Sequence, residues 1–370
     1  MEFQLPQYHA PDFTAEKLRA APDAAWGVCE RDGVPPQNFH STSMFPEYFK
    51  TGGVWRLAGE SRMDSHVVLD ETGTLRVVEM RNLKKGDRVA LGRTEDGSEG
   101  ILVHARGFLP PAGDRPREEF VFRQGRSRET SYARDYDALV RLLRHEREHG
   151  RIVWVMGPAF TFDAGARTAM QAMIEHGYVH GLLAGNALAV HDLEGGYFHT
   201  ALGQDIYTQE SMPNGHYNHM DVIHLVRRAG SIPAFLEQYN IRDGIFYGLV
   251  KQQIPFVLTG SIRDDGPLPE VYADVYAGAD AMRGLIRNAT TVICLATMLH
   301  TIAAGNMTPS FRRMPDGTIR PVYLYCVDAS EFVVNKLIDR GSLSATTMVA
   351  NVQDFITRVA GGLGILGQNP

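Results

Sequence analysis

The chain has 370 residues, a length that suits two or three domains. Its 37 Lys and Arg against 43 Asp and Glu give a net charge of -6, which argues against a nucleic-acid partner. No run of about 18 apolar residues exists, and the first residues lack a basic and an apolar signal region, so we expect a cytoplasmic protein without a membrane partner. Three widely spaced cysteines fit neither a disulfide scaffold nor a CxxC zinc site, and no metal is expected.

Patterning along the chain predicts three parts. Residues 1–25 are polar and proline-containing, which favours an extended arm. Residues 26–125 carry short alternating runs broken by turns, such as Thr72-Gly73, and predict a small β-rich domain. Residues 115–137, which span the boundary between the second and third parts, mix both charges without a period and are interpreted as a linker. Residues 126–370 are predicted to form an α/β domain.

In this third part, short apolar runs alternate with helical patterns. Runs at residues 151–160, 254–261, 290–299 and 321–330 are typical of strands buried on both faces. Helical spacing is found at 138–150, 166–177, 221–231, 278–289, 330–342 and 352–364, and residues 178–190 are interpreted as a strand followed by a glycine turn. This alternation predicts a Rossmann-like, mostly parallel sheet with helices on both faces.

Ligands of such sheets bind where the strands end at their carboxyl edge. Small residues and backbone amides in those turns suit a dinucleotide pyrophosphate. There is no GxGxxG motif, but Asp328 follows a strand pattern and could accept hydrogen bonds from ribose hydroxyls, which favours NAD over NADP. The alternative is an acid that merely lies near a helix N-terminus. The candidate cofactor residues in these turns are Gly157, Pro158, Asn186, Ala187, Gly260, Ser261, Ile262, Arg263, Thr297, Met298, Leu299, His300 and Asp328.

Two groups of residues are candidates for catalysis. Asp264 and Asp265 lie side by side in the string GSIRDDGPLP, where they could hold a substrate ammonium or move a proton; a solvated turn is the alternative. Histidines gather from His191 to His224, and we take His191 as the candidate for proton handling. Plain structural histidines are the alternative, and no HExxH motif supports zinc.

Several strings together resemble the archaeal-type ornithine cyclodeaminase family, over residues from about 26 to 364. They are GPAFTFDAGA, HGLLAGNALAVHDLE, RRAGSI, IPFVLTGSIRDDGPLP, ATMLHTIAAGN and CVDASEFVVNKLIDRGS, with DGVPPQNFHSTSMFP, MDSHVVLD and MRNLKKGDRVALG in the β-rich part. The family is related to a region of plant lysine-ketoglutarate reductase/saccharopine dehydrogenase and to the second half of the cyanobacterial arginine dihydrolase/ornithine cyclodeaminase. Its NAD-binding half is similar to deoxyhypusine synthase.

The resemblance implies a homo-oligomeric lyase that uses NAD as a recycled hydride carrier. Ornithine would be oxidised at C2 to an imine, the terminal amine would attack that carbon, ammonia would leave, and the ring imine would be reduced to proline. The resemblance also implies that the candidate turns, together with Asn306, surround NAD. A proton-transfer role for Asp264 or Asp265 is our own inference from the residues.

The chain departs from the family pattern outside the cofactor strings. Phe162-Asp163 stands where the family has His-Thr, Met44 where it has asparagine, and Asn218 where it has a second histidine. These differences suggest an altered substrate pocket. The alternative function is therefore an NAD-using enzyme of the same fold that oxidises, epimerises, eliminates or transfers an imine on another amino acid or amine. A third hypothesis, a regulatory subunit that senses NAD or an amino acid, is disfavoured by the two adjacent carboxylates.

Overall fold

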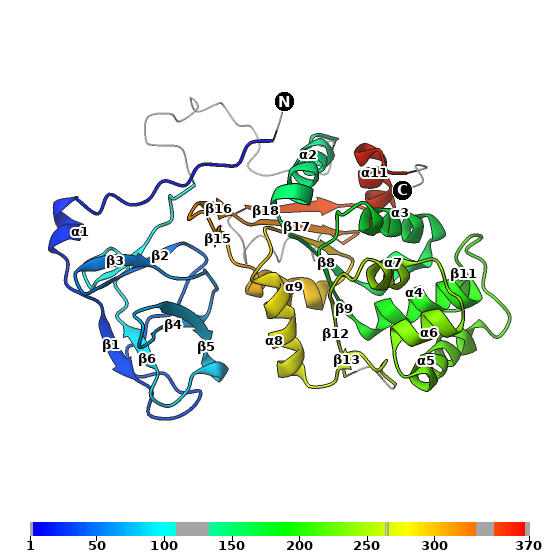
Figure 1. Ribbon diagram of the computed structural model, residues 1–370, viewed down its shortest axis with the longest axis horizontal. Coiled ribbons are helices and arrows are strands. Elements are labelled where there is room, and N and C mark those ends of the chain that lie inside the picture. Colours follow the sequence, from blue (N-terminus) through cyan, green and yellow to red (C-terminus); the bar gives the residue numbers. More distant parts are fainter. Residues whose placement is uncertain (1–2, 109–132, 263, 265, 331–343, 367–370) are drawn as a thin grey trace.

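The computed structural model describes residues 3–108, 133–262, 264, 266–330 and 344–366. It contains an antiparallel β region built from the first part of the chain and an α/β region built from the rest (Figure 1). The predicted boundary at residues 125 and 126, most of the predicted linker and the predicted helix at 330–342 lie outside the described residues. None of the described helices has the length and apolarity needed to cross a membrane.

The arm at the start is extended except for one short helix, α1 (Glu16–Ala20). Two antiparallel sheets follow, in the strand orders β1-β6-β4-β5 and β3-β2-β7. Their side chains enclose a small core around Phe49, Val67 and Ile101, as the alternating runs predict. The strands are β1 (Ala25–Val28), β2 (Glu47–Thr51), β3 (Val54–Leu57), β4 (Ser65–Leu69), β5 (Leu75–Glu79), β6 (Arg88–Leu91) and β7 (Ile101–Val103).

The α/β region is built on a seven-stranded sheet in the order β13-β12-β9-β8-β14-β17-β18, and every neighbouring pair is parallel. The predicted fold class is confirmed. The strands are β8 (Ile152–Met156), β9 (Gly181–Gly185), β12 (Phe256–Thr259), β13 (Val271–Tyr272), β14 (Thr291–Leu295), β17 (Tyr323–Asp328) and β18 (Ser344–Val349). The chain builds outward from β8 to β13, then returns to place β14 on the other side of β8, so the order reverses between β8 and β14.

Helices cover both faces of this sheet (Figure 1). A hydrophobic core lies on each face of the sheet. Side chains of β8 point alternately to the two cores: Trp154 faces one, and Val153 and Val155 face the other. The first core takes in α2 (Ala133–His149), α3 (Ala164–Glu175), α4 (Asn186–Phe198), α5 (Asn218–Ala229), α6 (Ile232–Gln238), α7 (Ile245–Lys251) and α11 (Val352–Leu363). The second takes in α8 (Val275–Ile286) and α9 (Met298–Met307).

Two expectations about elements were wrong. The apolar run at 290–299 is not one strand, because β14 ends at Leu295 and α9 begins at Met298. The run at 178–190 does contain β9, but the residues after Gly185 form α4 rather than a turn. The small hairpins β10 (Thr200–Ala201) with β11 (Gln204–Asp205), and β15 (Phe311–Arg313) with β16 (Ile319–Pro321), were not predicted.

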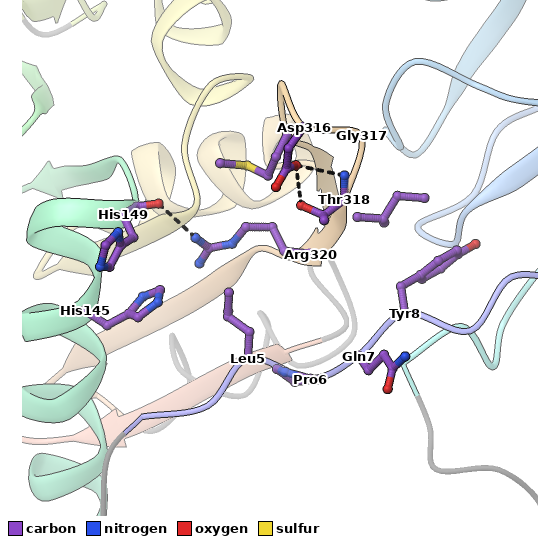
Figure 2. A pocket seen from close by; sticks show the side chains of 12 residues that line it. Leu5, Pro6, Gln7, Tyr8, His145, His149, Asp316, Gly317, Thr318 and Arg320 are labelled. Atoms are coloured by element: carbon purple, nitrogen blue, oxygen red, sulfur yellow. Dashed lines mark hydrogen bonds between the residues drawn. The ribbon is translucent and has the colours of Figure 1, made fainter.

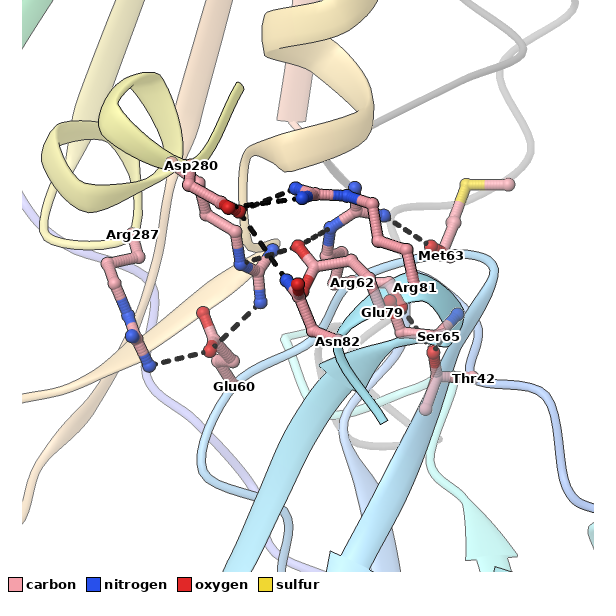
Figure 3. Close-up of polar contacts among 11 residues, drawn as sticks. Thr42, Glu60, Arg62, Met63, Ser65, Glu79, Arg81, Asn82, Asp280 and Arg287 are labelled. Atoms are coloured by element: carbon pink, nitrogen blue, oxygen red, sulfur yellow. Dashed lines mark hydrogen bonds and ion pairs between the residues drawn. The ribbon is translucent and has the colours of Figure 1, made fainter. Parts of the chain in front are cut away.

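Ion pairs join the β-rich region to α8 (Figure 3). Arg283 on α8 donates to Glu79 on β5 at 2.9 Å and to Glu60 at 3.1 Å, and all three side chains are nearly buried. Arg81 pairs with Asp280 at 2.5 Å at the rim of the same contact. Burial alone would raise the pKa of Glu79, but Arg283 and Arg62 outweigh it and the pKa is lowered. These contacts hold both regions in one arrangement.

Candidate active site

The carboxyl edge of the sheet at the β8–β14 reversal is where an open α/β sheet binds ligands. Gly157 follows β8 there, and its amide donates to the Leu295 carbonyl at 2.9 Å. A Cβ on Gly157 would collide with the carbonyl of Ala296, so only glycine lets the two loops meet. Ala296 itself has a positive φ of 50°, an uncommon conformation for a residue with a side chain.

Two helices begin at this edge with amide groups that no side chain caps among the described residues. They are α4, whose N-cap is Gly185, and α9, whose N-cap is Thr297. Helix α3, by contrast, is capped by Asp163, which accepts a hydrogen bond from the Ala166 amide at 2.7 Å. Amides at a helix N-terminus attract anions such as phosphate.

His300 ties three of the strand-end loops together. Its Nε2 is hydrogen-bonded to Thr259 Oγ1 at 3.1 Å and its Nδ1 to Thr297 Oγ1 at 3.3 Å, while its ring packs on Gly185. Burial lowers the pKa of His300 more than the nearby Asp264 carboxylate raises it. The imidazole is therefore neutral near pH 7, and it supplies one donor and one acceptor to this edge.

The loop after β12 holds the candidate carboxylate that the structure describes. Asp264 accepts a hydrogen bond from the Ser261 amide at 2.7 Å, and Gly260 donates to the Tyr272 carbonyl at 2.9 Å. Ile262 points fully into solvent. Arg263 and Asp265, the other two predicted residues of this loop, lie outside the described residues.

The remaining cofactor candidates are spread more widely. Asp328 ends β17 and accepts from the Ser330 amide at 2.8 Å, while Asn186 accepts from the Leu268 amide at 3.0 Å and so fastens α4 to the loop after β12. Pro158 begins the short helix that follows β8, and Ala187 is the second residue of α4, which follows β9. Asn306 lies eight residues into α9, about 12 Å along the helix axis from its start, and its place beside the cofactor stays a prediction.

A second polar group lies beside α4. His191 is nearly buried and its Nδ1 is hydrogen-bonded to Glu194 Oε2 at 2.9 Å. Glu194 also accepts from Thr200 Oγ1 and from the amides of Leu202 and Gly203. Burial alone would raise the pKa of Glu194, but these hydrogen bonds outweigh it, so the pKa is lowered and the carboxylate stays ionised.

The faces of the His191 ring are lined by rings from two other segments. Phe162 lies 5.8 Å away between ring centroids and His219 lies 6.0 Å away. The Nδ1 atom of His219 is buried and has no hydrogen-bond partner among the described residues. A histidine fixed by an ionised carboxylate is an arrangement that can accept and return a proton.

The sequence prediction did not single out Glu194 or Thr200. Glu194 follows His191 by three residues, a spacing that brings two side chains together once the segment is known to be helical. Because α4 was interpreted as a turn, that signal was missed. Asp163, which we associated with a changed substrate pocket, caps α3 instead of standing free. No set of three or more His, Cys, Asp or Glu side chains in the described ranges is arranged to hold a metal ion.

The carboxyl edge has the features that a dinucleotide requires. The uncapped starts of α4 and α9 suit a pyrophosphate, and the Asp328 carboxylate suits a ribose. Three exposed apolar side chains, Ile262, Met298 and Leu299, offer surface for flat rings. The residues present therefore fit the predicted cofactor class.

Known proteins are similar to this chain over most of its length. Residues 138–359 match the family model described as "Arginine dihydrolase ArgZ-like, C-terminal, Rossmann fold". The ornithine cyclodeaminase of Methanocaldococcus jannaschii is 38% identical over 339 residues, which are 88% of this chain and 74% of that protein. A conserved LOR/SDH protein from Methanococcus maripaludis has a crystal structure that superposes with a TM-score of 0.83 at 32% identity, covering 94% of this chain and 100% of that one.

A further solved structure is a complex with ligands. The ternary complex of AgrE with ornithine and NAD+ superposes with a TM-score of 0.56 at 31% identity. The match covers 94% of this chain and 47% of AgrE. Ornithine and NAD+ are thus bound together in a protein of which about half resembles this chain.

Proposed function

Because the chain belongs to the family of the archaeal ornithine cyclodeaminases and the ArgZ-like C-terminal Rossmann-fold domains, we propose that it is an NAD-dependent amino-acid cyclodeaminase. Its substrate is ornithine or a close diamino-acid analogue, and its products are a cyclic secondary amino acid, which is proline when ornithine reacts, and ammonia. The observation that supports this most strongly is the AgrE complex, in which ornithine and NAD+ occupy one related protein. The carboxyl edge around Gly157, Thr297 and Asp328 is the proposed cofactor site.

The cofactor supplies reversible oxidation at C2 of the substrate when it is bound. The protein holds the dinucleotide by its phosphates at the starts of α4 and α9 and by a ribose at Asp328. His300 stays neutral and holds the loops after β9, β12 and β14 together. A rigid set of loops places the oxidisable carbon in a fixed position and contributes through orientation.

In this reaction, side chains of the protein transfer the protons. The α-amine must lose a proton before C2 is oxidised, and the terminal amine must be neutral to attack the imine. We assign the first transfer to His191, which the ionised Glu194 orients and stabilises when protonated. Asp264, with its neighbour Asp265, is assigned to hold the terminal ammonium and to take its proton.

The second candidate is an NAD-using enzyme of the same fold that acts on another amino acid or amine. One contact favours it. Phe162 lies against His191 at the position where the family pattern has a histidine, so the wall on this side of the proposed base is an uncharged aromatic ring, while His219 lies on another side. Such a wall accepts a more apolar substrate side chain than a histidine does.

Mass spectrometry of reaction mixtures tests the two candidates. The purified protein is checked for bound NAD and mixed with ornithine, lysine and 2,4-diaminobutyrate that carry deuterium at C2. The cyclodeaminase predicts release of ammonia and a cyclic product that keeps the deuterium, without net NADH. Stoichiometric reduced cofactor that carries the deuterium, with a keto acid or the ring imine it forms spontaneously, would favour a dehydrogenase. No turnover with any diamino acid would contradict the proposal.

A further inference from the structure

A cavity of about 600 Å³ lies at the amino-terminal edge of the sheet, away from the proposed active site. It is enclosed by three segments that are distant in sequence. These are the arm at residues 5–8, the end of α2 with His145 and His149, and the β15–β16 hairpin from Met314 to Arg320. Figure 2 shows Arg320 extending from β16 toward His149, between the hairpin and the helix. This volume is typical of small-molecule sites.

Arg320 is the buried charge in the wall of this cavity. Its side chain is 4% exposed. It donates to Glu146 Oε1 at 2.5 Å and to the His149 carbonyl at 3.3 Å, but its Nε has no hydrogen-bond partner among the described residues. A buried donor without a partner costs free energy, so each such group calls for an explanation.

Two more arginines surround Arg320. Arg312 lies directly opposite Arg320 across the β15–β16 ribbon, a like-charged pair that destabilises a hairpin. Arg151 precedes β8 and is close enough that it and Arg320, together with burial, lower the pKa of Arg312. Each of these two arginines also has a buried nitrogen without a hydrogen-bond partner in the described part of the chain.

The carboxylates near these arginines already have hydrogen-bond or ion-pair partners. Glu146 is fully buried and accepts from Arg320, from His145 Nδ1 at 3.0 Å and from the hydroxyls of Thr290 and Thr291. Glu60, the other acid near Arg312, is paired with Arg283 and Arg287. Asp316, on the hairpin, accepts from the amide and hydroxyl of Thr318. Asp316 lines the cavity and keeps its negative charge, but the three arginines still outnumber the two carboxylates Glu146 and Asp316.

We propose that this cavity binds a small molecule through an oxyanion, a carboxylate or a phosphate, which the Arg320 guanidinium and the His149 imidazole receive. The planar guanidinium suits an oxyanion, and an anion would relieve the repulsion among the three arginines. The apolar part of the ligand lies against Leu5, Pro6 and Ile319. Because the strands separate this cavity from the carboxyl edge, the ligand does not compete with the proposed cofactor.

Calorimetric titration of the full chain with inorganic phosphate and with succinate, in excess NAD and at constant ionic strength, tests the proposal. We expect saturable binding of at least one probe with a Kd below about 1 mM. Phosphate alone, succinate alone or both would identify the oxyanion. No saturable binding of either probe up to about 10 mM would overturn the proposal.

Substitutions at Leu5 and Arg320 test whether the anion binds in this cavity. Leu5→Glu places a carboxylate at the wall and should weaken binding by about tenfold or more, while Leu5→Gln, its uncharged match, leaves it nearly unchanged. Leu5 is 37% exposed, so neither change threatens the fold. Arg320→Lys keeps the charge beside Glu146 but loses the planar fork, and should also weaken binding by about tenfold. Equal affinity in both Leu5 variants would contradict this location.

The control for charge alone is Arg147→Gln, on the same helix as His149 but outside the cavity wall. It removes one exposed positive charge and should leave the affinity within about twofold of the original. If it weakens binding as much as Leu5→Glu does, the probes respond to net charge, and the proposal fails.

Discussion

At the scale of single residues, the proposed site depends on close contacts between loops that follow different strands. Gly157 lets the loops after β8 and β14 touch, and His300 binds Thr259 and Thr297 at once. Glycines and polar residues in strand-end turns could be found in the sequence because they follow apolar runs directly. The contact between His300 and Thr259 could not be found in this way, since it forms only when β12 and β14 align in the sheet.

Gly157→Ala tests the close approach at the sheet reversal. The added Cβ meets the Ala296 carbonyl, so the loops must separate, and we expect the free energy of unfolding to fall by about 1–3 kcal/mol and NAD affinity to fall with it. Urea denaturation and NAD titration measure the two effects. Gly284→Ala is the matched control, because a Cβ there meets no atom within 4 Å and alanine favours the helix. Equal losses in both variants would contradict the close approach.

The pH dependence of stability tests the state of His300. Burial lowers the folded-state pKa of His300 below its ordinary value of 6.5, so the unfolded chain binds more protons below that pH. The contribution to stability is complete above pH 6.5 and is lost as the pH falls through the folded-state pKa. Chemical denaturation between about pH 7.5 and 5 should give a smaller slope of unfolding free energy against pH in His300→Gln, by up to one proton. An unchanged slope would refute the assignment.

At the scale of elements, the sequence predicted most strands of the sheet but not the helices that begin the site. Continuous apolar runs marked β8, β12, β14 and β17 because both faces of the sheet are covered. Burial also explains why helices α4 and α9 were missed. Many of their residues are buried, so these helices lack the one-sided apolar spacing that identifies a surface helix.

Helix α8 offers a test of how the two regions are held together. Arg283→Ala leaves Glu60 with Arg287 and Glu79 with Arg62 but removes the partner that they share, and we expect a loss of about 2–3 kcal/mol in unfolding free energy. Arg287→Ala removes a half-exposed arginine that also pairs with Glu60, and should cost less than about 1 kcal/mol. Urea denaturation measures both. A similar cost for the two would show that burial of the Arg283 pair contributes little.

At the scale of the whole molecule, the two ends of the sheet have different characters. The carboxyl edge combines uncapped helix starts, Asp328 and exposed apolar side chains. The amino edge gathers Arg151, Arg312 and Arg320 under the arm. The sequence predicted the first end because parallel strands place all their following turns together. It could not predict the second, because that cavity needs the arm, α2 and a hairpin that share no local pattern.

A crystal structure of the protein with NAD and ornithine would show whether the carboxyl edge holds NAD. We expect the pyrophosphate at the starts of α4 and α9, a ribose at Asp328, and the substrate between the cofactor and His191. A nucleotide bound instead among Arg151, Arg312 and Arg320, or a carboxyl edge left empty at saturating NAD, would contradict it.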